Sequence, residues 1–366
     1  METEYTVVGG GVVGLALAWG LLKRGRSVRV LDGDDGSFRA SRGNFGLVWV
    51  QSKGLDAPAY ARWSKRAAAS WRGFADELQA GSGIDVSLVQ DGGYDIHFDD
   101  RTLAETVEKY QRLKAKLDGE YPFEVLGANA LRNEEPAVGP EVTGAILHHE
   151  DGHVNPLKLL KALALDVRRL GAEVLTGRKV SAFEHREGEF HTRTDGGEIF
   201  ASEKVVLAAG LGAIQLGPLL GFKAPITPLR GQVLITEKIP RLINRPSLIA
   251  RQVDEGGVQI GDSKEDVGFN DEETLATTAR IAARAVRAFP ELAKVKLVRS
   301  WGALRIMSPD GLPIYQQSKT MPGAFLVTCH SGVTLASSHA RLMPDWFEQT
   351  DGAPDLGVFS EDRFDV

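Results

Sequence analysis

Three glycines near the N-terminus, Gly9, Gly11 and Gly14, constrain the fold of this chain more than any other feature of its sequence. They follow an apolar run at residues 5–8 and open a helical pattern over residues 15–24. In this setting the first glycine permits a tight turn and the second lets the backbone approach a pyrophosphate. The third lets the helix pack closely on the strand. The pattern therefore predicts a βαβ unit that binds a dinucleotide.

An acidic residue stands where such a unit needs one. Residues 27–31 form a second strand pattern that ends at Asp32, where a carboxylate can accept hydrogen bonds from an adenosine ribose. Val13 lies between the second and third glycines and belongs to the predicted cofactor-binding turn. A glycine-rich turn without a ligand would explain the glycines, but not the agreement of both strands, the helix and the acid.

Composition narrows the class of protein. The 366 residues amount to about two domains, and 43% hydrophobic with 25% charged residues is typical of a globular protein with a large core. The 41 glycines form no repeat, which excludes collagen-like and low-complexity chains. With a net charge of −6, non-specific attraction to nucleic acid or anionic lipid is not expected.

Targeting signals are not expected either. The weakly charged stretch 7–22 is interrupted by glycine and is shorter than the ~20 apolar residues that span a bilayer, and acid precedes it. We therefore expect no transmembrane segment. The single cysteine, Cys329, cannot form an internal disulfide, so we expect a cytoplasmic protein and a buried thiol.

The dinucleotide-type pieces are scattered along the chain. This predicts a discontinuous nucleotide-binding domain at 1–80, 142–216 and 315–366, interleaved with a substrate domain at 81–141 and 217–314. Helical patterns cover 57–79, 102–116, 157–170 and 272–289, and strand-like runs include 86–89 and 94–98. The predicted fold class is α/β, with a Rossmann-like domain and an α+β domain built on an antiparallel sheet.

Three features favour FAD over NAD as the dinucleotide. The βαβ unit is N-terminal, and a buried strand ends at Ala208, Ala209 and Gly210, which can place bare backbone beside a cofactor. The last strand runs into Ser331, Gly332, Val333 and Thr334 before a helix, and offers amide donors for an anionic oxygen. An NAD-dependent dehydrogenase remains an alternative on these residues alone.

Motifs over nearly the whole chain resemble the FAD-dependent D-amino acid oxidase superfamily, in particular its glycine oxidase and sarcosine oxidase-like branch. The chain is also similar to the catalytic subunits of opine and hydroxyproline dehydrogenases. The resemblance rests on the following segments, in family order: 7–14 with Asp32, 40–46, 151–156, 208–210, 301–305, 310–313 and 330–332.

The resemblance implies roles for several residues. The loop that passes the pyrophosphate and the flavin ring would contain Ser41, Arg42, Asn44, Phe45 and Gly46, and the backbone of Val180 would meet adenine. Arg305 matches the arginine that holds the substrate carboxylate, a task suited to its planar fork. His330 stands where its side chain can reach flavin or substrate, although a structural histidine is the alternative.

The implied reaction is oxidation of the Cα–N bond of a small amino acid. Hydride would pass from Cα to flavin N5, and the imine would hydrolyse to a keto acid and an amine or ammonia. Glycine or N-substituted glycines are the first choice of substrate. The alternatives are a dehydrogenase subunit for opine, D-amino acid or hydroxyproline substrates that passes electrons to a partner subunit, and a flavin-binding protein without turnover. A homo-oligomer stays open.

Three departures from the family pattern matter. Gln259 occupies the place of a lysine that activates oxygen in some relatives, so oxygen is in doubt as electron acceptor. Ile249 replaces a carboxylate-binding tyrosine, and alternation along a strand puts Arg251 on the same face. We therefore expect Arg251 to contact substrate, for example at the second carboxylate of an N-carboxyalkyl amino acid, with a solvated surface charge as the alternative. No cysteine stands at 307–309, where relatives tether flavin, so FAD is expected to bind non-covalently.

Overall fold

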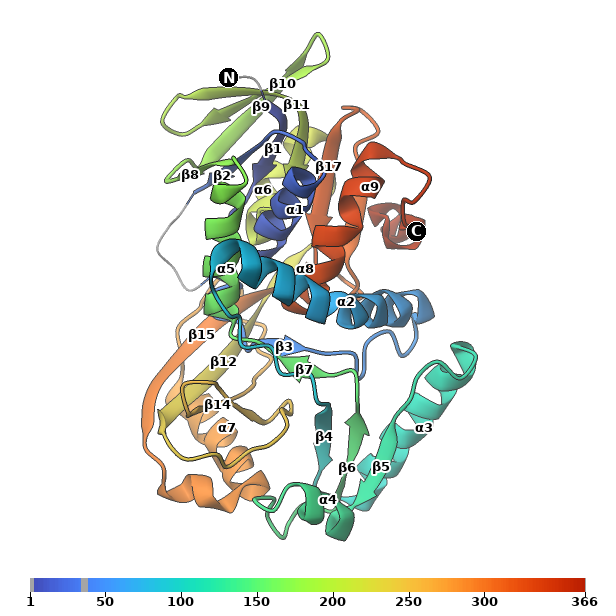
Figure 1. Cartoon of the computed structure of the whole chain (residues 1–366), viewed down its shortest axis with the longest axis vertical. Coiled ribbons are helices and arrows are strands. Elements are labelled where there is room, and N and C mark those ends of the chain that lie inside the picture. The colour runs from blue at the N-terminus through green and yellow to red at the C-terminus, as the bar shows by residue number, and fades with distance from the viewer. Residues whose placement is uncertain (1–2, 34–38, 366) are drawn as a thin grey trace.

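The computed structural model describes residues 3–33 and 39–365, and Figure 1 shows an upper and a lower half. The upper half is built on a sheet of order β16-β17-β11-β1-β2-β8, which β10 and β9 extend from β11. The strands from β17 to β8 are parallel, and the apolar residues of β1, β2 and β17 are buried, as expected for strands covered on both faces. The bounds are β1 Thr3–Val8, β2 Val28–Asp32, β8 Glu173–Thr176, β9 Val180–Arg186, β10 Glu189–Thr194, β11 Ile199–Leu207, β16 Ile314–Gln317 and β17 Ala324–Thr328.

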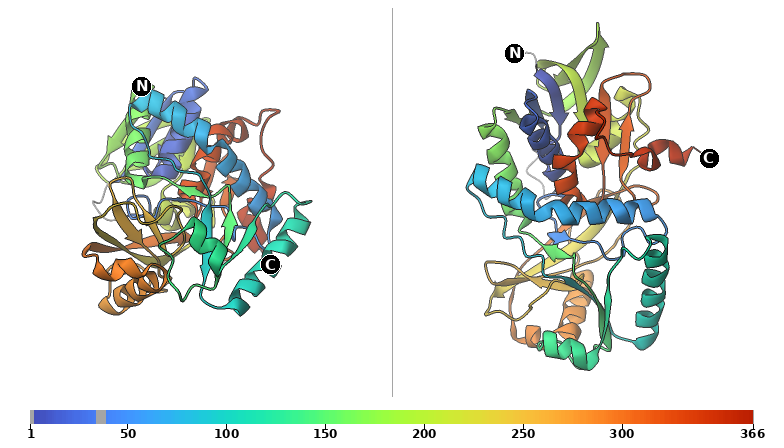
Figure 2. Two further views of the ribbon diagram at one scale, coloured as in Figure 1. Left: turned by 60° about the horizontal axis from the view of Figure 1, so that its bottom comes forward. Right: turned by 45° about the vertical axis from the view of Figure 1, so that its right-hand side comes forward.

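Helices of the upper half pack in two tiers. α1 (Val12–Lys23) contacts both α5 (Pro156–Arg169) and α8 (Gly332–Arg341), and α2 (Pro58–Ser82) crosses over α5 and α8. Both views in Figure 2 show α2 as one long rod, and it lies at the boundary between the halves in Figure 1. The short helices α6 (Ala213–Leu216) and α9 (Met343–Glu348) complete this half.

The start of α5 shows how local sequence sets an element. Asn155 accepts hydrogen bonds from the amides of Leu157 and Lys158, both at 3.2 Å, and Pro156 occupies the first helical turn. An Asn cap followed by Pro is a strong start signal, because Pro removes an amide that would otherwise lack a partner.

The lower half contains antiparallel sheets (Figure 1). One has the order β13-β14-β12-β15 and carries α7 (Leu275–Ala288), and another has the order β4-β6-β5 beside α3 (Asp100–Lys116) and α4 (Ala128–Glu134). β3 and β7 pair at the boundary between the halves. The bounds are β3 Leu47–Val48, β4 Gly93–His97, β5 Glu124–Gly127, β6 Gly144–His148, β7 Gly152–His153, β12 Thr227–Lys238, β13 Ala250–Gln252, β14 Gly257–Ile260 and β15 Leu297–Met307.

The predicted fold class is confirmed: a parallel, helix-covered βαβ core is joined to antiparallel sheets. Two local predictions are wrong. Residues 86–89 form no strand beyond an isolated bridge at Val89, because Asp85 accepts from the Ser87 amide and turns the chain. The boundary at 142 is too early for β6, which pairs with β4 and β5 in the lower half. The remaining domain boundaries stay a prediction.

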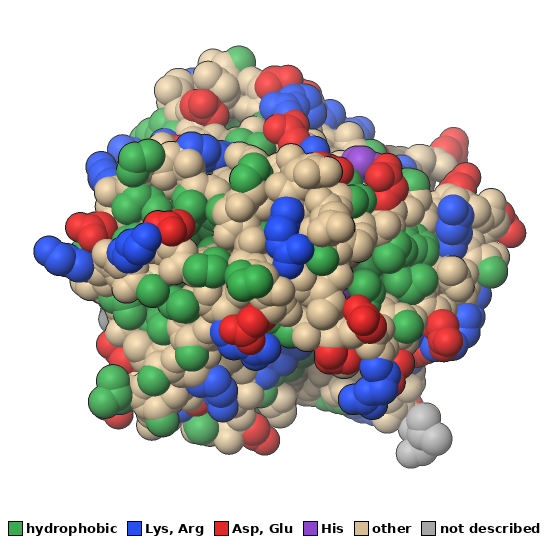
Figure 3. All heavy atoms as spheres, turned by 90° about the horizontal axis from the view of Figure 1, so that it is seen from below, with side chains coloured by type: hydrophobic (Ala, Val, Ile, Leu, Met, Phe, Trp, Pro, Cys, Tyr) green, Lys and Arg blue, Asp and Glu red, His purple; other side chains and the backbone are tan. Residues whose placement is uncertain are grey.

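The surface shows no marked charge separation on the side drawn in Figure 3. Among the residues coloured there, Lys and Arg are interspersed with Asp and Glu, and apolar side chains lie between them. Within the described residues, no helix has the length and apolar character that crossing a membrane requires.

Gly20 lets α1 and α8 approach closely, and this contact generates a stability prediction. A Cβ on Gly20 would lie 2.1 Å from the carbonyl oxygen of Ala340, so Gly20→Ala must push the helices apart. We expect a loss of about 1–3 kcal/mol in the free energy of unfolding, measured by urea titration. Gly352→Ala is the control, because none of the described atoms lies within 4 Å of its added methyl group. Equal stability of the two variants would contradict this packing argument.

Candidate active site

A cavity of about 280 Å³ lies between the two halves. The loop over residues 40–53 and the start of α8 form its upper wall, and β12 and β15 form the wall opposite. Side chains of both walls therefore face one space. The lining includes Gly43, Asn44, Phe45, Trp49, Lys53, Gly231, Asp262, Lys264, Arg305, His330, Ser331, Val333 and Thr334.

The glycine turn has the steric properties that a dinucleotide needs. A Cβ on Gly14 would lie 1.9 Å from the carbonyl oxygen of Gly9, so α1 can pack on β1 only with glycine there. A Cβ on Gly11 would meet only Ser41 among the described residues, and the Oγ of Ser41 lies 3.0 Å away and accepts from the Val12 amide. Gly11 is the N-cap of α1 and has no side chain with which to cap the helix. The space beside Gly11 and the start of α1 therefore fit a pyrophosphate.

The predicted adenosine-binding residues converge around the end of β2. Asp32 is buried there, and the Arg178 amide donates to its carbonyl oxygen at 2.8 Å, which brings the start of β9 and Val180 to this corner. The Asp32 carboxylate accepts from both terminal nitrogens of Arg39, at 2.8 and 3.3 Å. Ala209 lies beside the turn, since a Cβ on Gly9 would come within 3.0 Å of its Cα.

The predicted cofactor loop is pressed against the lower half. A Cβ on Gly43 would lie 2.4 Å from the Cβ of Ala303 in β15, and Trp301 donates to the Gly43 carbonyl oxygen at 3.2 Å. Asn44 accepts from the Gly46 amide at 2.7 Å and holds the turn. At the start of this loop, the Arg42 amide donates to the carbonyl oxygen of Arg39 at 2.9 Å. Gly210, after β11, also lies near the lower half, beside Ile306 of β15.

The start of α8 meets the start of α1. A Cβ on Gly332 would lie 3.0 Å from the Val13 side chain, so the two helix N-termini point into one region. Thr334 accepts from the Trp49 amide at 3.1 Å, and Ser331 accepts from the Tyr60 hydroxyl at 2.9 Å and from Lys53. Ser331 does not cap α8 with its side chain, and the first amides of the helix suit an anionic edge.

Arg305 lies in the cavity wall and is held from behind. Its guanidinium lies over Gly231, donates to the carbonyl oxygens of Arg230 at 3.2 Å and Ser263 at 2.8 Å, and pairs with Asp262 at 2.7 Å. Burial lowers the pKa of Arg305, and the Asp262 carboxylate opposes that shift. The arrangement leaves a fixed cation at the cavity, as expected of a residue that binds a carboxylate.

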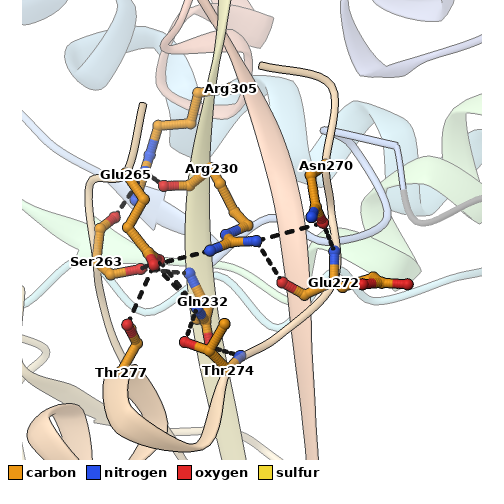
Figure 4. Close-up of polar contacts among 9 residues, drawn as sticks. All are labelled: Arg230, Gln232, Ser263, Glu265, Asn270, Glu272, Thr274, Thr277 and Arg305. Carbon is orange, nitrogen blue, oxygen red and sulfur yellow. Dashed lines mark hydrogen bonds and ion pairs between the residues drawn. The ribbon is translucent and has the colours of Figure 1, made fainter. Parts of the chain in front are cut away.

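Glu265 organises the segment that carries Asp262 and Lys264. In Figure 4 its carboxylate lies among Arg230, Gln232, Ser263 and Thr277, which all donate to it. Burial raises the pKa of Glu265, but these hydrogen bonds outweigh it and lower the pKa to about 2. The same figure shows Arg305 above this network. Glu265 thus fixes the segment after β14 against β12.

His330 lines the cavity as a neutral imidazole. Burial lowers its pKa well below the ordinary value, and the charges of Lys53, Arg305 and Lys264 lower it further. Those three cations line the same cavity as the histidine. The neighbouring Cys329 is buried, which raises the pKa of its thiol to about 12 and agrees with a packed, unreactive cysteine.

The structure does not support the substrate contact expected for Arg251. It is only 2% exposed and does not line the cavity; its guanidinium donates to the Phe45 carbonyl oxygen, to Gln259 at 2.6 Å and bonds His153 at 2.9 Å. Neither a substrate contact nor a solvated charge describes it. Strand alternation says which face a side chain takes, but not which distant loop covers that face. Ile249 precedes β13 and packs in the lower core.

Several lining residues were missed by sequence reasoning. Lys53 and Trp49 follow the predicted cofactor loop without a motif of their own, and Asp262 and Lys264 lie on an irregular segment. For Asp262 and Lys264 the sequence offers one signal, because both residues come shortly after the strand pattern that forms β14.

A family model described as FAD dependent oxidoreductase (DAO) matches residues 4–346. This chain belongs to that family. The predicted resemblance is confirmed, FAD is the cofactor, and the chain is an FAD-dependent oxidoreductase. The glycine turn and the helix N-termini described above fit FAD.

Individual relatives extend the comparison. The chain is 41% identical to a subunit of opine oxidase from Rhizobium meliloti, over 100% of this chain and 98% of the relative. It is 42% identical to the corresponding opine oxidase subunit of Agrobacterium tumefaciens (strain Ach5), over 99% and 98%. The crystal structure of glycine oxidase from Geobacillus kaustophilus has the same fold, with a TM-score of 0.91, 24% identity and 98% of each chain covered.

The Glu265 network generates a pH prediction. Because the folded pKa lies below the ordinary value of 4.5, this group stabilises the fold above about pH 4.5 and loses its contribution as pH falls toward 2. Glu265→Gln should therefore be less stable than the parent at about pH 7, with a gap that narrows by about pH 3. Thermal unfolding with saturating FAD measures it. Glu105→Gln, an exposed change on α3, is the control, and a gap independent of pH would contradict the prediction.

Proposed function

We propose that this chain is the FAD-dependent catalytic subunit of an enzyme that oxidises the secondary amine of opine-type substrates, which are N-carboxyalkyl amino acids. The observation that carries the proposal is Arg305, a fixed guanidinium facing the cavity between the FAD-binding half and the antiparallel sheet. The similarity to the opine oxidase subunits over the whole chain supports this substrate class above simple glycine.

Arg305 would bind and orient the substrate carboxylate. Its backbone-carbonyl contacts leave the guanidinium in one place, and Asp262 balances its charge until a carboxylate arrives. FAD, when bound, supplies the two-electron acceptor for oxidation of the C–N bond. Orientation by the protein then accounts for much of the rate, since a small misplacement of the reacting carbon is costly.

His330 would contribute as a neutral group. Its lowered pKa keeps a further positive charge out of a cavity that already contains Lys53, Lys264 and Arg305. A neutral imidazole can accept a hydrogen bond from the substrate amine or donate one to a carboxylate. It would thus position substrate without acting as an acid at neutral pH.

We further propose that the electrons leave through a partner subunit and not through oxygen. Gln259, at the place of an oxygen-activating lysine, is buried and bonded to Arg251 and Asn44, and it does not line the cavity. The relatives at 41% and 42% identity are named as subunits, which supports a partner that accepts electrons.

Anaerobic reduction of the purified holoprotein tests the substrate class. An N-carboxyalkyl amino acid should bleach the visible flavin absorption faster, at equal concentration, than glycine or an N-methyl amino acid. Reoxidation in air should then be slow compared with reoxidation by an artificial electron acceptor. Bleaching by glycine alone would overturn the proposed substrate, and immediate reoxidation by air would overturn the proposed partner.

Arg305→Met tests the role of the guanidinium. Loss of a charge-assisted pair to the carboxylate should lower kcat/KM about 100-fold, with FAD content unchanged. Arg299→Met on the same strand is the matched control, because Arg299 is exposed and does not line the cavity. An equal fall in kcat/KM in both variants would contradict the prediction, because it would indicate an effect of the total positive charge on β15 and not a contact made by Arg305.

A further inference from the structure

Lys53 is a cation of the cavity wall that neutral groups hold in place. It is half-buried, its ammonium donates to the Ser331 hydroxyl, and the Tyr60 ring centroid lies 5.9 Å from Nζ. Within the part of the chain that the structure describes, no carboxylate forms an ion pair with it. Burial accordingly lowers the pKa of Lys53 to about 8. Partly buried charges ordinarily have a partner, so a ligand anion would complete this site.

The loop that carries Lys53 is fixed. Asp151 accepts from the amides of Val50 and Gln51, the Gln51 side chain donates to the Gly93 carbonyl oxygen at 2.8 Å, and the Lys53 amide donates to Val50 at 3.1 Å. Burial lowers the pKa of Lys53, and the charge of Asp151 opposes that shift, but among the described residues Asp151 forms no ion pair with the ammonium. A tethered lysine loses less freedom when it binds a ligand than a mobile one.

The position of Lys53 complements that of Arg305. Lys53 comes from the upper wall beside α8, and Arg305 comes from β15 on the wall opposite. Lys53, Arg305 and His330 all line the same cavity. The lining contains the cations Lys53, Lys264 and Arg305 but, among the described side chains, Asp262 as its carboxylate, and Asp262 already pairs with Arg305. The cavity is therefore suited to more than one substrate carboxylate.

We propose that Lys53 binds the second carboxylate of the substrate, the one on the N-carboxyalkyl arm, while Arg305 binds the amino acid carboxylate. This inference rests on the proposed function and deepens it. An N-carboxyalkyl amino acid has one carboxylate on each side of its secondary amine, so two cations on opposite walls hold the amine between them. An N-alkyl amino acid satisfies only one of the two. Lys53 is then the residue that selects dicarboxylates.

Dead-end ligands separate this binding from turnover. Oxydiacetate has two carboxylates around an ether oxygen and has no amine to oxidise, and methoxyacetate lacks one of the carboxylates. Titration of the FAD-loaded protein, followed by the flavin visible spectrum, should give a Kd for oxydiacetate about 10–100-fold below that for methoxyacetate. Lys53→Met should abolish this preference, and Lys53→Arg should retain much of it.

Lys264→Met is the matched control, since it removes the same charge from the same cavity at an exposed position. Retention of the preference in Lys264→Met with its loss in Lys53→Met supports direct binding by Lys53. The inference is overturned if the parent protein shows no preference, if Lys53→Met keeps it, or if both lysine variants lose it equally. An equal loss would indicate a general charge effect.

Turnover of N-carboxyalkyl amino acids tests the proposed function independently of Lys53. Preference for oxydiacetate without such turnover would remove the opine assignment and keep Lys53 as a carboxylate-binding residue. Turnover of N-carboxyalkyl amino acids without a Lys53-dependent preference would keep the opine assignment and overturn the role of Lys53. A change in the flavin spectrum of ligand-free Lys53→Met, with both Kd values shifted alike, would place the ammonium on the cofactor and overturn its role toward substrate.

Discussion

The close contact between Gly43 and Ala303 is the constraint on which the rest of the site depends. It joins the cofactor loop of the upper half to β15 of the lower half, and a single methyl group on Gly43 would force them apart. Because Arg305 is two residues along the same strand, this contact sets how far the guanidinium lies from the cofactor side. The two halves can therefore present the Arg305 guanidinium and a dinucleotide turn to one cavity only at this spacing.

Charge in the cavity follows from how each cation is held. Arg305 pairs with Asp262 and is anchored by backbone carbonyls, which offset part of the cost of its burial. Lys53 has hydroxyl and aromatic neighbours but, among the residues described, no paired carboxylate, so its charge remains available to a ligand. Burial lowers the pKa of His330, and the charges of the other cations lower it further, so the imidazole stays neutral. The three groups of the cavity therefore differ in charge state and pairing: Arg305 is paired, Lys53 has no ion-pair partner among the described residues, and His330 is neutral.

Sequence reasoning could predict what depends on local sterics. The glycine turn, the helix over 157–170 and the α/β class are consequences of neighbouring residues, and these agree with the structure. It could not predict the surroundings of Arg251, whose partners Phe45 and His153 lie 206 and 98 positions away. Lys53 had no motif either, because its significance arises only where the loop meets α8.

Arg251 joins the two halves at a second place, in addition to the contact of Gly43 with Ala303. Its guanidinium ties the Phe45 carbonyl oxygen of the cofactor loop to Gln259 of β14, and Gln259 in turn donates to the Asn44 carbonyl oxygen. A neutral side chain could not supply this fork of donors to acceptors from separate elements. A buried arginine here therefore shapes the cavity from behind its wall. Lys53 and Arg305, the cations proposed to bind substrate, line that wall, and Arg251 supports it from the other side.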